Sequence, residues 1–188
     1  MNLTEIYGYT WEQRKLSSVA TISGGGTPST NNSEYWNGKI NWFAPAEIGD
    51  VVYVSESKKK ITELGLNKSS ANILPVGTVL YTSRAGIGKT AILSAPSSTN
   101  QGFQSIIPGP ELDSYFVYAQ TDYLKKYGQK MGSGSTFDEI SGKQLSKFIM
   151  SVPNLKEQIN ISLFIKKFDQ TIASNQRKQK KPQKFIYL

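Results

Sequence analysis

The residues whose types first suggest a reaction are Gly88, Lys89 and Thr90, because a Gly-Lys-Thr run after a strand is typical of a loop that cradles nucleotide phosphates. That motif also needs a glycine at position 83, where this chain carries Ser83. The following residues reach Pro96 too soon to leave room for the helix whose N-terminus would hold the phosphate. We therefore expect no nucleotide hydrolysis, and we interpret the glycines as a tight turn between two strands.

Other reactive side chains are few. The 188 residues include no Cys and no His, which excludes thiolate nucleophiles, disulfides, imidazole bases and most transition-metal sites. Asp138 and Glu139 are adjacent in sequence, so their side chains point in different directions and do not form an acid-base pair. Glu111 and Asp113 lie where a helix is predicted to begin, and acidic side chains there interact favourably with the helix dipole. The chain also lacks the glycine-rich cofactor loop and the Asn- or Asp-Pro-Pro-aromatic motif of a base-modifying methyltransferase. We predict no catalytic residue, no metal site and no enzyme activity in this chain.

Side chains suited to reading DNA are more abundant in the loops. Amide groups such as those of Asn31 and Asn32 match the edge of adenine, and a guanidinium fork matches guanine. Ammonium groups suit phosphates, which fix position without carrying sequence information. Any single one of these residues is more simply explained as a solvated loop side chain, so only the set carries weight. The residues that we predict on the DNA face are Arg84, Lys89, Asn100, Gln101, Ser133 and Ser135, with Lys58, Lys59 and Lys60 on phosphates.

The basic charge is concentrated near the end of the sequence. The formal net charge is +8, from 22 Lys and Arg against 14 Asp and Glu. Residues 1–153 carry fourteen basic and twelve acidic side chains, a net of +2, whereas residues 154–188 carry eight and two, a net of +6. This end is either attracted to a polyanion such as DNA or is a solvated lysine-rich helix face, and charge alone leaves both interpretations open.

The elements that position the loops are predicted first from short β-like runs bounded by turn residues. The predicted strands are 41–44, 51–54, 78–82, 91–94 and 103–107. Two long polar loops, 23–38 and 94–102, lie before and between them. Loops of this length inside a compact domain are usually functional, although plain connectors remain an alternative.

Helical periodicity follows in the second half. Apolar residues at three- and four-residue steps predict one helix over 111–130. Ser141 and Gln144 match a capping box for a short helix, which the strand-like residues 148–152 follow. Together with the earlier strands, these elements predict a mixed α/β domain.

A longer helix is predicted over 156–181, which is about 40 Å, with Pro182 ending it. Its apolar stripe consists of Ile161, Ile165, Phe168 and Ile172. The spacing of four, three and four is that of the a and d positions of a coiled coil and predicts a partner helix. The alternative is that the stripe packs against its own domain. We therefore divide the chain into a globular domain, 1–153, and a helix with its tail, 154–188.

Six segments, taken in order, resemble one protein family. They are WEQRKLSSVATISGGGTPST, EYWNGKINWFAPAEI, ILPVGTVLYTSRAGIGKTAIL, TNQGFQSIIP, GSGSTFDEIS and VPNLKEQINISLFIKKFDQTI. From about Trp11 to Ile172 the chain resembles the specificity subunit of type I restriction-modification systems. The shared order of so many segments makes this resemblance more specific than any single motif. The ending QKKPQKFIYL departs from the leucine-containing continuation that is usual in the family.

The resemblance implies a part in DNA recognition. Such a subunit usually has two target-recognition domains joined by two long antiparallel helices, and each domain reads one half of a bipartite DNA site. Methyltransferase subunits, which bind S-adenosylmethionine and methylate adenine, dock on it, and restriction subunits that use ATP and Mg join for cleavage. For this chain it implies one target-recognition domain with a mixed, mostly antiparallel sheet and short helices, then one coiled-coil-type spacer helix. The chain itself would bind no cofactor.

The chain matches one of the two target-recognition domains and one of the two long helices of such a subunit. This has two explanations. The chain is either a fragment of a longer subunit or a half-subunit that pairs with a copy of itself. A helix pair of this length would separate two reading heads by about one turn of B-DNA, for which 34–36 Å is expected. Self-association would bury the apolar stripe, and its two-fold symmetry would predict an interrupted palindromic target.

Two other functions remain open. The chain could be the C-terminal specificity fragment of a fused restriction-methylation enzyme, or an interaction protein that binds methyltransferase subunits without DNA. No apolar run approaches the ~20 residues that span a bilayer, and the first residues lack the order of a signal peptide. We therefore expect a cytoplasmic protein without membrane contact.

Overall fold

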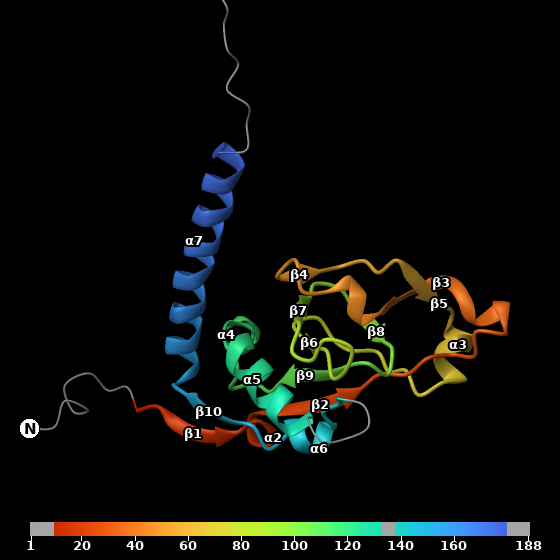
Figure 1. Ribbon diagram of the computed structural model, residues 1–188, viewed down its shortest axis with the longest axis horizontal. Coiled ribbons are helices and arrows are strands. Elements are labelled where there is room, and N and C mark those ends of the chain that lie inside the picture. Colours follow the sequence, from red (N-terminus) through yellow and green to blue (C-terminus); the bar gives the residue numbers. More distant parts are fainter. Residues whose placement is uncertain (1–9, 133–137, 180–188) are drawn as a thin grey trace, which may run out of the picture.

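The computed structural model describes residues 10–132 and 138–179, with the backbone alone for 173–179. One long helix projects from a globular body (Figure 1). The strands are β1 (Glu12–Lys15), β2 (Ala20–Gly24), β3 (Trp36–Phe43), β4 (Tyr53–Val54), β5 (Lys59–Ile61), β6 (Val79–Tyr81), β7 (Thr90–Leu93), β8 (Ser97–Thr99), β9 (Gln104–Pro108) and β10 (Ile149–Val152). The helices are α2 (Leu16–Val19), α3 (Glu63–Asn67), α4 (Ser114–Ala119), α5 (Thr121–Gly132), α6 (Gly142–Leu145) and α7 (Leu155–Gln179), with 3-10 turns η1 (Ser33–Tyr35) and η2 (Pro45–Glu47).

The described strands form three sheets. A five-stranded sheet has the order β2-β9-β6-β7-β4, a three-stranded sheet has the order β5-β3-β8, and β1 pairs with β10. Only the β3–β8 and β4–β7 pairs are parallel among the described strands. The predicted mixed, mostly antiparallel α/β architecture is therefore confirmed. Figure 1 shows α3, β3 and β5 on the side of the body far from α7.

Strand β6 separates the two main parts of the core. Val79 and Tyr81 pack on the side of α4 and α5, whereas Leu80, between them in sequence, packs with Phe43 and Phe103 on the other side. All three β6 residues are fully buried because successive strand side chains point to opposite faces of a sheet that is covered on both faces. The loop that follows β6 therefore starts from a fully buried strand.

The helix predicted over 111–130 is wrong in its extent. The Asp113 carboxylate accepts a hydrogen bond from the Phe116 backbone N–H at 2.9 Å, so the helix begins only at Ser114. It is then interrupted at Gln120, whose backbone φ and ψ are −92° and 13°. The Thr121 hydroxyl donates to the Tyr118 carbonyl and contacts the Thr90 hydroxyl at 2.6 Å, which ties the interruption to β7. Periodicity missed this break because the apolar stripe continues through it.

The polar loop predicted over 94–102 contains strand β8, which the sequence did not indicate. Its three residues, Ser97, Ser98 and Thr99, are buried and pair in parallel with β3. The Ser98 hydroxyl donates to the Asn41 carbonyl at 2.9 Å. Small hydroxyl side chains give no apolar alternation, so periodicity could not reveal a strand that is buried between neighbours.

Two predictions near the end of the body are confirmed. Ser141 and Gln144 form a reciprocal capping box at the start of α6, and a strand, β10, follows. Strand β1, which was not predicted, pairs with β10 and brings Glu12 opposite Val152. The start of the described chain therefore lies beside the base of α7.

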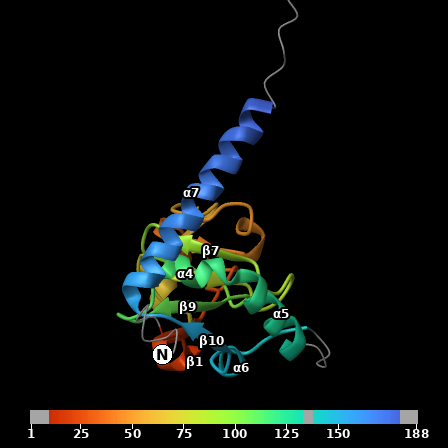
Figure 2. The ribbon, with the colours of Figure 1, turned by 90° about the vertical axis from the view of Figure 1, so that its left-hand side faces the viewer.

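The long helix α7 spans 25 residues, or about 38 Å, and begins where the Asn154 side chain accepts from the Glu157 backbone N–H at 3.0 Å. Figures 1 and 2 show it leaving the body beside α4 and projecting beyond it. The prediction of one long helix is confirmed, although residues 180 and 181 of the predicted range lie outside the described residues. Within the part of the chain that the structure describes, no helix is both long and apolar enough to cross a bilayer.

Candidate nucleic-acid interface

The SRAGIGK segment forms the predicted turn between β6 and β7. Ala85, Gly86 and Gly88 have positive φ angles of 52°, 102° and 93°. The Thr82 hydroxyl donates to the Gly86 carbonyl at 2.7 Å and accepts from the Lys89 backbone N–H at 2.9 Å, which closes the turn. A strand follows directly, so the Gly-Lys-Thr run has no helix N-terminus behind it with which to bind phosphate.

Four segments that are far apart in sequence meet around this turn, and we call them the motif cluster: 25–27, 83–89, 99–102 and 138–140. The Ser83 backbone N–H donates to the Gly102 carbonyl at 2.8 Å, and the Ser83 carbonyl accepts from Ile140 N–H at 3.0 Å. The Gly26 N–H donates to the Thr99 carbonyl at 2.9 Å. Backbone hydrogen bonds thus hold two of the family-like segments directly to the SRAGIGK turn, and a third, through Gly26, to the segment 99–102.

Glycine is required in the cluster where backbones approach closely. A Cβ on Gly88 would lie 2.5 Å from Lys125 Cβ and 2.6 Å from Lys125 Cα on α5, and its φ of +93° is itself unfavourable for other residues. A Cβ on Gly25 would overlap the Asn100 carbonyl oxygen. These glycines therefore serve packing of the framework, independently of any ligand.

A hollow of about 610 Å³ opens beside the turn. Its lining is Arg84, Ala85, Gly86, Ile87, Gln129, Asp138 and Glu139. Arg84 is half-buried there, and its role on the DNA face stays a prediction. Exposed Lys89 lies against Gly49, with 3.0 Å from Lys89 Cδ to the position of a Gly49 Cβ. The hollow brings a guanidinium and two carboxylates together, a set that matches guanine acceptors and the cytosine amino group.

Asn100 and Gln101 already use their side-chain oxygens within the motif cluster. Asn100 Oδ1 accepts from the Gly102 backbone N–H at 2.8 Å, and Gln101 Oε1 accepts from the Thr27 hydroxyl. Bidentate recognition of adenine needs both the oxygen and the amino group of an amide. In this conformation both residues hold the loops in place, and their role as base-reading residues stays a prediction.

The three predicted phosphate-binding lysines lie beside and in β5. Lys60 Nζ pairs with Glu56 Oε1 at 2.8 Å, and Lys59 Nζ lies 5.7 Å from the centre of the Trp36 ring. The hydrogen bond to Lys60 and then its charge hold the pKa of Glu56 below its usual value. Lys58 is exposed. Since two of the three ammonium groups have partners, Lys58 is the one best placed for a phosphate.

The loop around η2 links these lysines to the motif cluster. Glu47 Oε2 accepts from the Lys58 backbone N–H at 2.6 Å, while a Cβ on Gly102 would lie 2.8 Å from Pro45 Cγ. Asn32 caps η1 by accepting from Glu34 N–H at 3.0 Å. The predicted residues Ser133 and Ser135 lie outside the described residues.

Sequence reasoning missed part of the hollow. Gln129 comes from α5, and Asp138 with Glu139 precede α6, so only the fold brings them to Arg84. The two carboxylates were considered as an acid-base pair and set aside, but not as hydrogen-bond acceptors for a base. Within the described residues, no group of three or more His, Cys, Asp or Glu side chains is placed to hold a metal ion.

The predicted helix-pairing stripe is divided between two environments. Ile161 and Ile165 are half-buried and pack against the core of the body, as in the alternative interpretation. Phe168 and Ile172 are each 53% exposed, and Phe164, which the stripe did not include, is 63% exposed. Of the predicted stripe, only Phe168 and Ile172 are therefore uncovered and available to a partner helix.

Helix α7 is anchored to α4 mainly by polar contacts. Fully buried Gln158 donates to the Glu111 and Pro153 carbonyls at 2.9 and 2.8 Å and accepts from Asp113 N–H at 2.9 Å. The Ser162 hydroxyl donates to the Asp113 carboxylate at 2.5 Å. These contacts set the direction in which the helix leaves the body.

A second anchor lies two turns higher. The Tyr115 hydroxyl donates to Asp169 Oδ2 at 2.5 Å, and Lys166 Nζ lies 4.6 Å from the centre of the Tyr115 ring and 5.8 Å from that of Tyr53. Burial, and then the Asp169 carboxylate, raise the pKa of Tyr115, so the phenol stays protonated and remains a donor. Contacts from Gln158 to Asp169 thus hold α7 against the body.

Comparison with known proteins agrees with this arrangement. The family model of the type I restriction modification DNA specificity domain matches residues 9–181. The type I restriction enzyme MjaIX specificity subunit of Methanocaldococcus jannaschii is 37% identical over 173 residues, which cover 90% of this chain and 40% of that protein. The type I restriction enzyme EcoR124I/EcoR124II specificity subunit of Escherichia coli is 30% identical over 168 residues, 84% of this chain and 41% of that protein.

Solved structures share the fold. The HsdS subunit from Thermoanaerobacter tengcongensis superposes with a TM-score of 0.69 at 22% identity, over 93% of this chain and 41% of that one. A chain from a structure of the type I R-M system gives a TM-score of 0.70 at 23% identity, over 92% and 41%. The chain therefore spans about two fifths of the length of these relatives, 40% and 41% of the two specificity subunits. By its match over nearly its whole length, the chain belongs to the type I restriction modification DNA specificity domain family.

Proposed function

We propose that the chain is the DNA-reading part of a type I specificity subunit, in which the globular body recognises one half of a bipartite target. The observation that carries this proposal is the motif cluster around the SRAGIGK turn, where Arg84, Asp138 and Glu139 line one hollow. Membership of a DNA specificity domain family supports the same function. The chain acts in recognition and has no catalytic role.

Base reading and phosphate contact are divided between regions of the body. The hollow supplies a guanidinium fork and carboxylate acceptors, which can distinguish bases by hydrogen bonding. Exposed Lys58 and Lys89 contact phosphates and set the register of the protein on the duplex. Residues 154–188, with their net charge of +6, add a general attraction to DNA.

Assembly is the role of α7. The uncovered residues Phe164, Phe168 and Ile172 pair with the same residues of a second copy, which places two reading bodies about one turn of B-DNA apart. Two-fold symmetry makes the target an interrupted palindrome. Methyltransferase subunits that carry S-adenosylmethionine and restriction subunits that use ATP and Mg complete the complex in the cytoplasm. The matching relatives are specificity subunits, so the fused-enzyme alternative is not favoured.

Methylation profiling tests this function. The chain is expressed with its methyltransferase partner in a host that lacks other methylation, and the modified adenines are mapped by long-read sequencing. We expect one bipartite, palindromic motif, and we expect Arg84→Ala to relax the base preference at one position of each half-site. A methylation pattern without any motif contradicts the proposal, and a motif that is bipartite but asymmetric contradicts self-association alone.

A further inference from the structure

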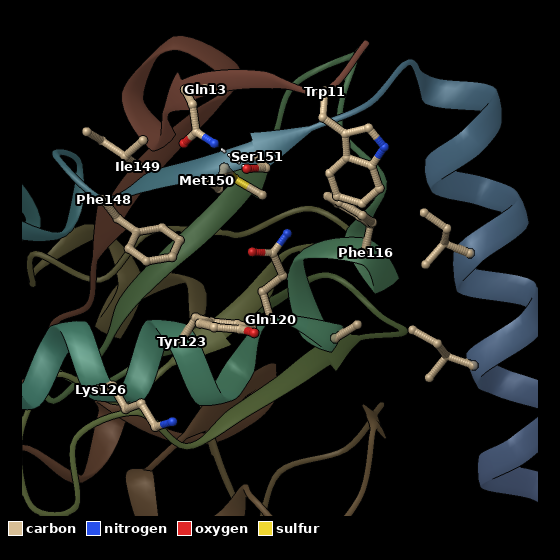
Figure 3. A pocket seen from close by; sticks show the side chains of 13 residues that line it. Trp11, Gln13, Phe116, Gln120, Tyr123, Lys126, Phe148, Ile149, Met150 and Ser151 are labelled. Carbon is tan, nitrogen blue, oxygen red and sulfur yellow. Dashed lines mark hydrogen bonds between the residues drawn. The ribbon is translucent and has the colours of Figure 1, made fainter. Parts of the chain in front are cut away.

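An apolar groove of about 540 Å³ runs between α7 and the body, away from the motif cluster. Figure 3 shows Trp11 and Phe116 on its side toward α7, and Phe148 and Tyr123 farther from that helix. Ile161 and Ile165 form the α7 wall, and Ile149 and Met150 of β10 close another side. Trp11, Tyr123 and Ile149 are 48%, 66% and 56% exposed, so the groove presents large uncovered apolar side chains.

The groove is continuous with the uncovered side of α7. Phe164 lies one residue from Ile165 and packs edge-to-face against Phe168 with ring centres 4.7 Å apart, and both phenylalanines are more than half exposed. At about 100° per residue, residues 161, 164, 165, 168 and 172 share one side of a helix with 3.6 residues per turn. A partner helix that packs on Phe164 and Phe168 therefore lies next to the groove as well.

Glu157 lies next to Trp11 but does not line the groove. The Trp11 indole donates to Glu157 Oε1 at 3.1 Å, and Glu157 Oε2 is buried by the chain itself. The charged side chain of the described lining is Lys126, among mostly apolar neighbours. The groove therefore suits an occupant that presents large apolar side chains.

The chain itself contains such a segment beyond the described residues. The sequence after Gln179 is KKPQKFIYL, in which three lysines lie close to Phe185, Ile186, Tyr187 and Leu188. We propose that this segment of a second copy occupies the groove, with the four apolar residues between Trp11, Phe148 and Tyr123. This proposal rests on the self-association that we propose for α7.

The length of the chain favours a second copy over the same chain. From Gln179 back to Ile165 is 14 residues of helix, about 21 Å. The six residues from Lys180 to Phe185 span about 20 Å when fully extended, and they would also have to reverse direction. Phe185 of the same chain would therefore barely reach the level of Ile165, and only if the segment reversed direction at once and stayed fully extended.

An antiparallel pair removes this difficulty. If two α7 helices pair about a two-fold axis at Phe168, the middle of the uncovered stripe, Gln179 of the second copy lies opposite Glu157. The residues that follow Gln179 then lie near the base of the first copy's α7, and the apolar residues continue toward Trp11 and β10. The two copies exchange their segments reciprocally.

Cross-linking of the full chain tests the proposal directly, because the sequence has no cysteine of its own. A tagged Ile149→Cys chain is mixed with an untagged Tyr187→Cys chain and treated with a short bismaleimide. We expect a product that joins one chain of each kind. The control pair is Leu64→Cys with Tyr187→Cys, since Leu64 is 42% exposed on α3 at the far side of the body; this pair should give at least about tenfold less product.

Dimer affinity provides the second measurement. Replacing all four residues, Phe185→Ser, Ile186→Ser, Tyr187→Ser and Leu188→Ser, keeps the length and should raise the dimer dissociation constant at least about tenfold in sedimentation experiments. Unfolding of this variant is measured in parallel at a concentration where the dimer is dissociated.

The outcomes separate the two proposals. If the wild-type chain stays monomeric, self-association fails and the groove proposal fails with it. If the chain dimerises but the Ile149→Cys and Tyr187→Cys chains form no joint product above the control, only the groove proposal is overturned. A chain that carries both substitutions and cross-links to itself in dilute solution would assign the groove to the same chain and would also overturn the proposal.

Discussion

The motif cluster and α7 are held in the molecule by contacts of different kinds. Backbone hydrogen bonds and glycines in close approach join the four segments of the cluster, and the Thr82, Asn100 and Gln101 side chains add further bonds. Helix α7 docks through side chains, the polar Gln158 and Tyr115 and the packed Ile161 and Ile165, and leaves Phe164, Phe168 and Ile172 uncovered. The shape of the first region therefore rests largely on backbone contacts, whereas the position of α7 depends on individual docking side chains.

Gly88→Val should have the largest effect on stability, because it disrupts the close packing of backbones in the motif cluster. The new side chain meets the backbone of Lys125 and requires a φ of +93°, so we expect a loss of about 3 kcal/mol in the free energy of unfolding, measured by urea titration. Gly49→Ala is the matched control: its φ is also positive, at +111°, but it meets only the flexible Lys89 side chain, and about 1 kcal/mol is expected. Equal losses would contradict the argument from close approach.

Gln158→Leu tests the dependence of α7 on individual contacts. It leaves the Asp113 N–H and the Glu111 carbonyl without partners, which should lower the free energy of unfolding by about 2 kcal/mol. Asn160→Ala, at an exposed position two residues on, should change it by less than about 0.5 kcal/mol. Circular dichroism during denaturation measures both, and an unchanged Gln158→Leu protein would show that the helix is held elsewhere.

Two aspartate substitutions sharpen the contrast within α7 itself. Ile161→Asp places a charge against the core and should cost about 2 kcal/mol of stability. Phe168→Asp should leave unfolding within about 0.5 kcal/mol and abolish self-association in sedimentation experiments. The division of the stripe into a packed and an uncovered half would be wrong if both variants behaved alike.

Substitutions in the proposed interface should affect DNA binding more than stability. Arg84→Ala should weaken binding of the preferred duplex by about 1–3 kcal/mol and relax specificity at one base pair. Lys58→Ala should weaken binding to all duplexes similarly and reduce the slope of log K against log salt by about one. Titrations at several salt concentrations with matched and scrambled duplexes distinguish these outcomes, and identical patterns would refute the proposed division of roles.

The smallest effect is expected at an exposed ion pair. The hydrogen bond and charge of Lys60 lower the pKa of Glu56, so the pair stabilises the fold above the ordinary carboxyl pKa, and that contribution disappears as the pH falls through the lowered value. Lys60→Met should return the Glu56 pKa toward its usual value in an NMR titration while binding of DNA through Lys58 persists. A Glu56 pKa that does not move would show that the pair is absent in solution.

Several features followed from the sequence because they depend on neighbours in the chain. The tight turn with Gly86 and Gly88, the capping box of Ser141 and Gln144, and the long helix are all predicted from local patterns, and all are present. Local hydrogen bonds and backbone preferences decide such features, so a few adjacent residues are enough to reveal them.

Other features depended on contacts between distant residues. The hydroxyl-rich strand β8 exists because β3 pairs with it, and the helix break at Gln120 is tied to Thr90 on β7. Gln129 and Asp138 reach Arg84 only because α5 and the segment before α6 pack around the turn. No local pattern encodes these arrangements, which is why the residues that line the hollow beside Arg84 were only partly predicted.

The amino-acid sequence alone established the kind of molecule: an α/β domain of the type I specificity family, with a long helix whose apolar stripe suggested assembly. The packing of the folded chain was needed to show that Ile161 and Ile165 belong to the body while Phe164, Phe168 and Ile172 do not. It also showed that the helix forms one wall of an apolar groove. The physical reason is that helical spacing defines which residues share a face, whereas packing against α4 and β10 defines which part of that face remains uncovered.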